Sequence, residues 1–186
     1  MPELPEVEVV KKSLKKDIKN LSITNVKVID GNLRYKVKKQ DINKIKGLKI
    51  LKIERRSKYL LFFFNKNILM TVHLGMTGKF FIIKNNNKKK TSFYYTIENI
   101  SRKHDRVIFF FNKKIQLVFN DIRKFGFIKI FKSNEIKNIK NIKTLGPEPL
   151  SEYYNFKYFK KYLIGRNRKI KDLLMDQKFV SGLGNI

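Results

Sequence analysis

The first residues of the chain bring an amine and two carboxylates close together. The sequence opens MPELPEVE, and removal of Met1 would leave Pro2 as an N-terminal secondary amine with Glu3 and Glu6 within one helical turn. An α-amino group has a reference pKa of about 7.7–8.0, against about 10.4 for lysine, so part of it is unprotonated at neutral pH. Such an amine can attack an electrophilic sugar or carbonyl carbon and form an imine-type intermediate. The alternative is that Pro2 and Pro5 only start a helix whose first turn favours acids.

The elements that must position these residues can be predicted from the spacing of apolar side chains. Leu4, Val7, Val10, Leu14 and Ile18 recur at helical spacing, which predicts a helix over residues 4–19. From residue 22 to about 131 the pattern changes to short β-branched and aromatic runs. The expected strands are 23–29, 48–54, 59–64, 68–74, 79–83, 93–97, 106–111, 115–119 and 127–131. Their number and spacing predict a β-sandwich or barrel.

Turns and breaks divide the rest of the chain. The sequence FFFNK occurs at 62–66 and at 109–113, and each copy predicts a strand that enters a hairpin turn. Residues 85–90 are polar and basic and predict a loop, and 133–144 predict a linker or a weak helix. The sequence GPEP at 146–149 is a break. Two further helices are expected, at 154–164 and 169–175.

Composition indicates a polyanionic partner. The 186 residues include 43 Lys and Arg against 15 Asp and Glu, a net charge of +28, which favours nucleic acid. The alternatives are an AT-rich genome that favours lysine codons, and an anionic membrane, for which no long basic amphipathic helix is evident. There is no cysteine, which excludes a disulfide framework and a thiolate zinc site. With no signal peptide or membrane span in the sequence, we expect a cytoplasmic protein.

Several segments in register resemble the formamidopyrimidine-DNA glycosylase family, bacterial enzymes that remove oxidised purines from DNA. The similar segments are PELPEVE at 2–8, RRSKYL at 55–60, HLGMTG at 73–78, KHDRV at 103–107, DIRKFG at 121–126, LGPEPL at 145–150, Lys171, MDQK at 175–178 and GLGNI at 182–186. They span the whole chain. The resemblance implies an α+β fold with an N-terminal helix and an antiparallel β-sandwich, followed by an incomplete helix-two-turn-helix domain.

The resemblance also implies the catalytic residues. Pro2 would attack C1′ of the damaged nucleotide and displace the base, and the resulting iminium would acidify the C2′ proton so that β- and δ-elimination cut the strand. Glu3 would move protons at the sugar, and Glu6 would orient the amino terminus. Lys58 would lie near the damaged base or its phosphate. From the residues alone, Lys58 reads as a solvated lysine before a strand.

A second constellation would contact the duplex. A base inside a duplex must be rotated outward before it can react, and the gap needs a filler. The resemblance assigns that role to Met76, Arg123 and Phe125 on two loops. From the residues alone, Met76 reads as a hairpin residue and Phe125 as part of the core.

The remaining predicted contacts are to DNA phosphates, which position the duplex without reading its sequence. By resemblance, His73 lies near the site, Lys103 and His104 contact the backbone, and Lys171 and Asn185 hold the phosphates that flank the flipped nucleotide. Two histidines without acidic or thiol partners at ligand spacing do not predict a metal site. We expect no cofactor in this chain, because the zinc ligands of the family are absent.

The resemblance implies two domains and a function. We expect a catalytic sandwich domain over 1–132, and over 133–186 a linker with the first part of a helical DNA-binding domain, ending before the family's zinc finger. The expected function is base-excision repair of oxidised purines by a bifunctional glycosylase and abasic-site lyase, acting as a monomer on damaged double-stranded DNA. The alternatives are a catalytically impaired remnant that only binds DNA, and a general basic nucleic-acid-binding protein.

Overall fold

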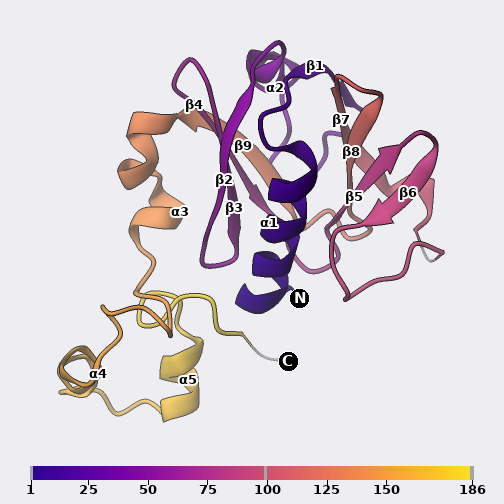
Figure 1. The fold of residues 1–186 in the computed structure, drawn as a ribbon. Helices are drawn as coiled ribbons and strands as arrows, with labels where there is room; N and C mark the ends of the chain where they lie inside the picture. Colours follow the sequence, from indigo (N-terminus) through magenta and orange to yellow (C-terminus); the bar gives the residue numbers. More distant parts are fainter. Residues whose placement is uncertain (1, 99, 185–186) are drawn as a thin grey trace.

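The protein folds into a β-sandwich and a smaller helical lobe, residues 145–184 (Figure 1). A computed structural model describes residues 2–98 and 100–184 of the chain. In chain order the elements are α1 (Leu4–Ile18), β1 (Ile23–Val28), α2 (Lys39–Ile42), η1 (Asn43–Ile45), β2 (Ile50–Arg56), β3 (Tyr59–Phe64), β4 (Ile68–His73), β5 (Lys79–Lys84), β6 (Asn87–Lys90), η2 (Arg102–His104), β7 (Asp105–Phe111), β8 (Ile115–Asn120), β9 (Phe127–Lys132), η3 (Ser133–Asn138), α3 (Lys140–Lys143), α4 (Phe156–Leu163) and α5 (Ile170–Met175). The α+β fold class predicted from the sequence is confirmed.

Helix α1 buries one stripe against the sandwich. Val7, Val10, Leu14 and Ile18 are fully buried, and they recur every three or four residues, so they share one face of the helix. Burying an aliphatic side chain of this size contributes about 1.5–3 kcal/mol. The stripe holds the start of the helix, and with it Pro2 and Glu3, at one end of the sandwich.

Two antiparallel sheets form the sandwich. One has the strand order β1-β7-β8-β5-β6 and the other β2-β3-β4-β9. Phenylalanines fill the space between them: Phe62 of β3 lies 6.2 Å from Phe80 of β5, and Phe80 lies 5.2 Å from Phe119 of β8, between ring centroids. The predicted sandwich is therefore correct, and its aromatic core fixes the strand ends that carry the site.

Both predicted FFFNK hairpins are present. Residues 65–67 connect β3 to β4, with Lys66 and Asn67 at positive φ. Residues 112–114 connect β7 to β8, with Lys113 and Lys114 at positive φ. Two consecutive positive φ angles are typical of the tight turns that match the twist of paired strands.

The sequence prediction was wrong between residues 85 and 97. The expected loop at 85–90 contains strand β6, which pairs with β5 through a turn with Asn85 and Asn86 at positive φ. The expected strand at 93–97 is absent; that segment has no regular structure, and Tyr95 packs on the outer face of the sheet. Because β6 is an exposed edge strand of lysines, it needs no apolar residues, so its pattern was not recognisable.

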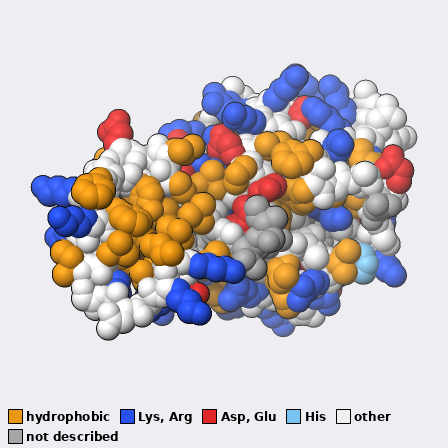
Figure 2. Space-filling view, turned by 90° about the horizontal axis from the view of Figure 1, so that it is seen from below, with side chains coloured by type: hydrophobic (Ala, Val, Ile, Leu, Met, Phe, Trp, Pro, Cys, Tyr) orange, Lys and Arg blue, Asp and Glu red, His pale blue; other side chains and the backbone are white. Residues whose placement is uncertain are grey.

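The helical lobe has its own small core. Phe179 is fully buried, and Tyr162 stacks on it with 4.0 Å between ring centroids. The two predicted helices are present as α4 and α5, and the predicted linker at 133–144 contains the short helices η3 and α3. Figure 2 shows hydrophobic side chains gathered on one face of this lobe. The exposed apolar residues of the lobe include Leu150 and Tyr153. In the described ranges, no helix combines the length and apolar character needed to cross a bilayer.

Candidate active site between the helix start and the helical lobe

The predicted catalytic residues Glu3 and Lys58 meet in the structure. The Lys58 ammonium lies 2.5 Å from Glu3 Oε2, and both residues are about 5% exposed. Lys58 lies in the two-residue β2–β3 turn with Ser57, whose φ is 54°. The interpretation of Lys58 as a solvated lysine is therefore wrong. A buried carboxylate paired with an ammonium can accept or release a proton beside a reacting atom.

The start of α1 aligns the residues next to Pro2. Glu6 Oε2 accepts a hydrogen bond of 2.9 Å from the Glu3 backbone amide, and Pro5 lies in the first turn. Pro5 and Glu6 thus occupy positions that suit the first turn of a helix, as the sequence predicted. Pro2 itself is buried beside this turn.

The last described residues, Gly182 to Gly184, pack against the start of α1. The Gly182 carbonyl accepts a hydrogen bond of 3.3 Å from the Leu4 amide, and Gly182 has a φ of 105°, which favours glycine. A Cβ added at Gly184 would overlap both carboxylate oxygens of Glu3. The segment is held in turn by Gln177, whose Oε1 accepts from the Gly182 amide at 2.9 Å and whose Nε2 donates to the Leu183 carbonyl at 2.7 Å. The glycines therefore allow this backbone to lie directly against Glu3.

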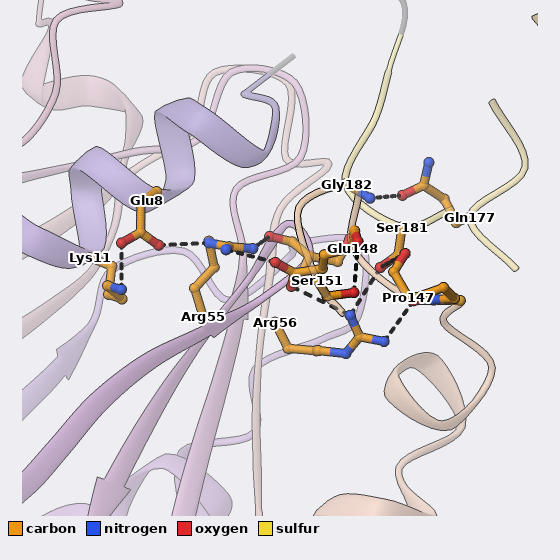
Figure 3. Close-up of polar contacts among 12 residues, drawn as sticks. Glu8, Lys11, Arg55, Arg56, Pro147, Glu148, Ser151, Gln177, Ser181 and Gly182 are labelled. Carbon is orange, nitrogen blue, oxygen red and sulfur yellow. Dashed lines mark hydrogen bonds and ion pairs between the residues drawn. The ribbon is translucent and has the colours of Figure 1, made fainter. Parts of the chain in front are cut away.

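An ion-pair network joins the sandwich to the helical lobe beside this site (Figure 3). Arg55 Nε donates to Glu8 at 2.8 Å, and its Nη2 donates to Glu148 Oε2 at 2.8 Å. Glu148 Oε1 also accepts from the Ser57 amide at 2.6 Å. Burial alone would raise the pKa of Glu148, but the hydrogen bonds from Arg55 and the Ser57 amide lower it overall.

Arg56 extends the network into the lobe. Its guanidinium donates to the Gly146 carbonyl at 2.7 Å and to the Ser181 hydroxyl at 3.0 Å (Figure 3). Sequence reasoning did not identify Arg55, Arg56 or Glu148 as functional residues. The runs RRSK and GPEP were noticed, but no spacing rule predicts that residues 91 to 93 positions apart will pair.

Two hollows flank the Glu3–Lys58 pair. Glu3 lines a hollow of about 820 Å³ between the helix start and the helical lobe, and Lys58 lines a second of about 650 Å³. The second contains basic and aromatic side chains together, namely Arg34, Lys58, Lys178, Tyr35, Tyr59, His73 and Phe127. Cations and aromatic faces are the groups that hold nucleotide phosphates and bases. Nothing in the sequence pattern marked Arg34 or Tyr35 as part of a site.

His73 lies in the second hollow as a neutral side chain. Burial first, and then the charges of Lys58 and Arg34, lower its pKa from 6.5 to about 4. Its Nδ1 accepts a hydrogen bond of 3.0 Å from the Gly75 amide, so the single proton belongs on Nε2. The ring stacks on Phe127, its cross-strand partner, with 5.6 Å between centroids.

The three residues predicted to fill the DNA gap lie on two loops that adjoin the paired residues His73 and Phe127. Residues 74–78 follow His73 at the end of β4, and 121–126 precede Phe127 at the start of β9. Met76 and Phe125 are each 43% exposed, and the Arg123 guanidinium lies 4.6 Å from the centre of the Phe125 ring. The interpretation of Phe125 as a core residue is therefore wrong.

The remaining predicted DNA contacts that the structure describes lie on η2 and on α5. Lys103 is exposed on η2, and the His104 carbonyl accepts a hydrogen bond of 3.0 Å from the Asp121 amide. Lys171 is exposed on α5 and lines a hollow of about 380 Å³ with Leu183 and Gly184. Asn185 lies outside the described residues.

Comparison with known protein families now identifies the class to which this fold and site belong. The model of the formamidopyrimidine-DNA glycosylase N-terminal domain matches residues 1–128, and that of the formamidopyrimidine-DNA glycosylase H2TH domain matches 145–186. The chain belongs to the formamidopyrimidine-DNA glycosylase family. It is 42% identical to the formamidopyrimidine-DNA glycosylase of Rickettsia felis and 38% identical to that of a Wolbachia strain from Brugia malayi, over all 186 residues.

Solved structures agree with this assignment. A Lactococcus lactis Fpg in complex with DNA containing an abasic site superposes with a TM-score of 0.83 at 30% identity, covering 100% of this chain and 64% of that one. A second Lactococcus lactis complex, with DNA that contains N7-benzyl-Fapy-dG, gives the same score at 31% identity. The chain spans 63% of the length of the Rickettsia felis relative and 64% of the Wolbachia one. With no cysteine, its residues do not fit the four-cysteine zinc site expected for the family.

Proposed function

We propose that this chain carries out base-excision repair chemistry on oxidised purines such as 8-oxoguanine and formamidopyrimidines, as a DNA glycosylase with abasic-site lyase activity. Pro2, exposed as the N-terminal amine after Met1 removal, is the nucleophile. Glu3 moves protons at the sugar, Lys58 lies near the damaged base or its phosphate, and Glu6 orients the terminus. The observation that carries the proposal is the buried Glu3–Lys58 pair at the helix start.

The chemistry proceeds from base displacement through two eliminations to hydrolysis of the imine. The Pro2 nitrogen forms a bond to C1′, and the bond from C1′ to the base breaks, so the base leaves with the electron pair and is protonated. The nitrogen then loses its proton, the C1′–O4′ bond breaks, and O4′ takes up a proton, so that the opened sugar is held as a cationic iminium. The iminium allows loss of the C2′ proton and cleavage of the 3′ C–O bond. Loss of the C4′ proton and cleavage of the 5′ C–O bond follow, and water hydrolyses the imine to regenerate Pro2.

We further propose how the DNA is held. Met76, Arg123 and Phe125 fill the gap left by the extruded nucleotide, with Arg123 toward the orphaned base. Lys103, His104, Lys171 and Asn185 contact phosphates, and His73 lies near the site. The net charge of +28 adds salt-dependent attraction to any DNA. The partner is damaged double-stranded DNA in the cytoplasm, bound by a monomer with a catalytic domain over 1–132 and a helical region over 133–186.

A strand-cleavage assay tests this function. End-labelled duplexes with one abasic site, one 8-oxoguanine or no lesion are incubated with the chain at near-physiological salt. We expect cleavage of the abasic duplex to be fastest, because it needs no base recognition and little flipping energy. Glu3→Gln should lower that rate about 100-fold, since positioned proton transfer contributes about 10²–10⁴-fold.

The matched control is Glu54→Gln, which removes a carboxylate that pairs with Lys52 at the surface of β2. It should cleave at the wild-type rate. A chain that shifts the mobility of all three duplexes without cutting any of them would instead support the alternative of a remnant that only binds DNA.

A further inference from the structure

We infer that Asp121 and Thr77 form a positioning unit that holds the two DNA-probing loops together, so that Met76, Arg123 and Phe125 act as one wedge. This inference rests on the proposed function, in which those three residues enter the duplex. Neither Asp121 nor Thr77 touches the reacting atoms. Each acts through the loop that carries the exposed residues.

One hydroxyl links the loops in a directed chain of hydrogen bonds. Thr77, on the 74–78 loop, donates from Oγ1 to Asp121 Oδ1 at 2.5 Å. The same oxygen accepts from the Arg123 amide at 2.9 Å. The hydroxyl thus donates its single hydrogen to the Asp121 carboxylate and accepts with one lone pair from the Arg123 amide, and both partners lie on the 121–126 loop. Loss of the hydroxyl would leave both a carboxylate oxygen and the Arg123 amide without this partner.

The Asp121 carboxylate holds the far end of its own loop. Oδ2 accepts from the Gly126 amide at 2.8 Å, which closes residues 121–126 into a compact turn. The side chain is fully buried, and its backbone is fixed as well: its amide donates to the His104 carbonyl at 3.0 Å, and its carbonyl accepts from Arg106 Nε at 2.7 Å. A buried carboxylate with hydrogen bonds on both oxygens defines one geometry for the loop.

The loop backbones also touch directly. A Cβ added at Gly75, whose φ is 66°, would lie 2.5 Å from the Phe125 carbonyl carbon and from the Gly126 nitrogen. A Cβ at Gly126 would lie 2.7 Å from Phe119 and 2.9 Å from the His73 carbonyl. Because no side chain separates the two backbones at Gly75 and Gly126, a shift of one loop must move the other. Their exposed side chains are therefore presented to DNA in a fixed relation.

The test removes the hydroxyl and compares duplex with single-stranded substrate. Thr77→Val keeps the branched shape without the hydroxyl, Thr77→Ser keeps the hydroxyl, and Thr77→Ala also lacks it but leaves space for water. Thr24→Val is the matched control, because the exposed Thr24 hydroxyl donates to the Phe110 carbonyl on β7, away from both loops. Borohydride trapping rates on abasic duplex and abasic single strand are measured beside thermal unfolding.

We expect Thr77→Val and Thr77→Ala to slow trapping on the duplex about tenfold, since an unpaired buried group costs about 1–3 kcal/mol and 1.4 kcal/mol is tenfold. Trapping on the single strand should change less than about twofold, because no base needs displacing there. Thr77→Ser should restore the duplex rate, and Thr24→Val should match the wild type. Equal losses on both substrates, or no rescue by serine, would overturn the inference.

A binding measurement separates this inference from the proposed chemistry. 2-Aminopurine placed opposite the abasic site reports displacement of that base when protein binds, whether or not a covalent bond forms. Thr77→Val and Thr77→Ala should reduce the fluorescence change at saturating protein, while the wild type and Thr77→Ser give the full change. An equal change in all variants would reject the positioning unit, whereas absent trapping by the wild type would reject only the proposed catalysis.

Discussion

Arg55 and Glu148 lie 93 positions apart in the sequence, and their side chains form an ion pair of 2.8 Å that fastens the helical lobe to the sandwich. The pair is next to the candidate active site, since both residues line the hollow that contains Glu3. We therefore expect the ionisation of Glu148 to affect how firmly the helical lobe is held beside Glu3.

Glu148→Gln should reveal that dependence. The folded pKa of Glu148 is below its usual 4.5, so the stabilisation from its charge is present above pH 4.5 and is lost as the pH falls through the folded pKa. At pH 7 we expect the variant to be about 1–3 kcal/mol less stable, because Arg55 loses one of its two charged partners and keeps only Glu8. Urea unfolding from pH 7 to pH 3 should show this difference shrinking toward acid.

The control for Glu148 is again Glu54→Gln, whose partner Lys52 is exposed. An exposed pair contributes about 0.2–1 kcal/mol, so its effect on stability should be small at every pH. A Glu148→Gln difference that stays constant down to pH 3 would mean that the charge does not hold the lobes together.

Gly184→Ala should disturb Glu3 directly. The added methyl group would occupy the space of the Glu3 carboxylate, so the carboxylate must move away from Lys58. We expect abasic-strand cleavage to fall about 100-fold, comparable with loss of the proton-transfer group. Gly165→Asn is the matched control, because Gly165 has a φ of 71° and open space around its Cβ position, and asparagine tolerates this backbone. Equal activity of the two variants would contradict the close packing on Glu3.

His73 should titrate far below an ordinary histidine. Its folded pKa of about 4 lies below the ordinary histidine pKa of 6.5, so its contribution to stability is complete above pH 6.5 and declines as the pH falls toward 4. With only two histidines in the chain, NMR can follow both, and His73→Asn assigns the signals. A His73 midpoint near 6.5 would show that the ring is solvated and not enclosed beside Lys58.

Arg123→Ala should affect duplex substrates more than single strands. The Arg123 guanidinium is exposed and stacks on the Phe125 ring, so its loss removes a group that can reach into a duplex without disturbing the core. We expect the reaction on an abasic duplex to be about tenfold slower, which corresponds to a loss of about 1.4 kcal/mol of stabilisation by the group that fills the gap. The measurement is single-turnover cleavage of both substrates. Equal losses would assign Arg123 to phosphate binding or folding.

Local patterns in the sequence predicted local structure well. The apolar stripe of α1 and the two FFFNK hairpins could be read directly, because side-chain period and turn chemistry act over a few residues. The polar edge strand β6 could not, since an edge strand of lysines has no apolar face to mark it.

The site was only partly predictable, because sequence patterns report on contacts between residues that are close in the chain. Spacing near the N-terminus placed Glu3 and Glu6 beside Pro2, but the partners of Glu3 come from residues 58 and 184, which only the tertiary fold brings together. For Phe125 the sequence pattern predicted burial in the core, whereas the structure exposes the ring. An aromatic residue between strands is usually buried, yet the turn closed by Asp121 presents it to solvent.

The most direct test of the proposed function is the identity of the residue that becomes attached to DNA. The chain is incubated with an abasic duplex and sodium borohydride, digested with a protease and a nuclease, and analysed by mass spectrometry. We predict a deoxyribose adduct on an N-terminal peptide that begins at Pro2, and strong loss of the adduct in Pro2→Gly. An adduct on a lysine such as Lys58, or trapping that persists in Pro2→Gly after N-terminal acetylation, would contradict nucleophilic catalysis by Pro2.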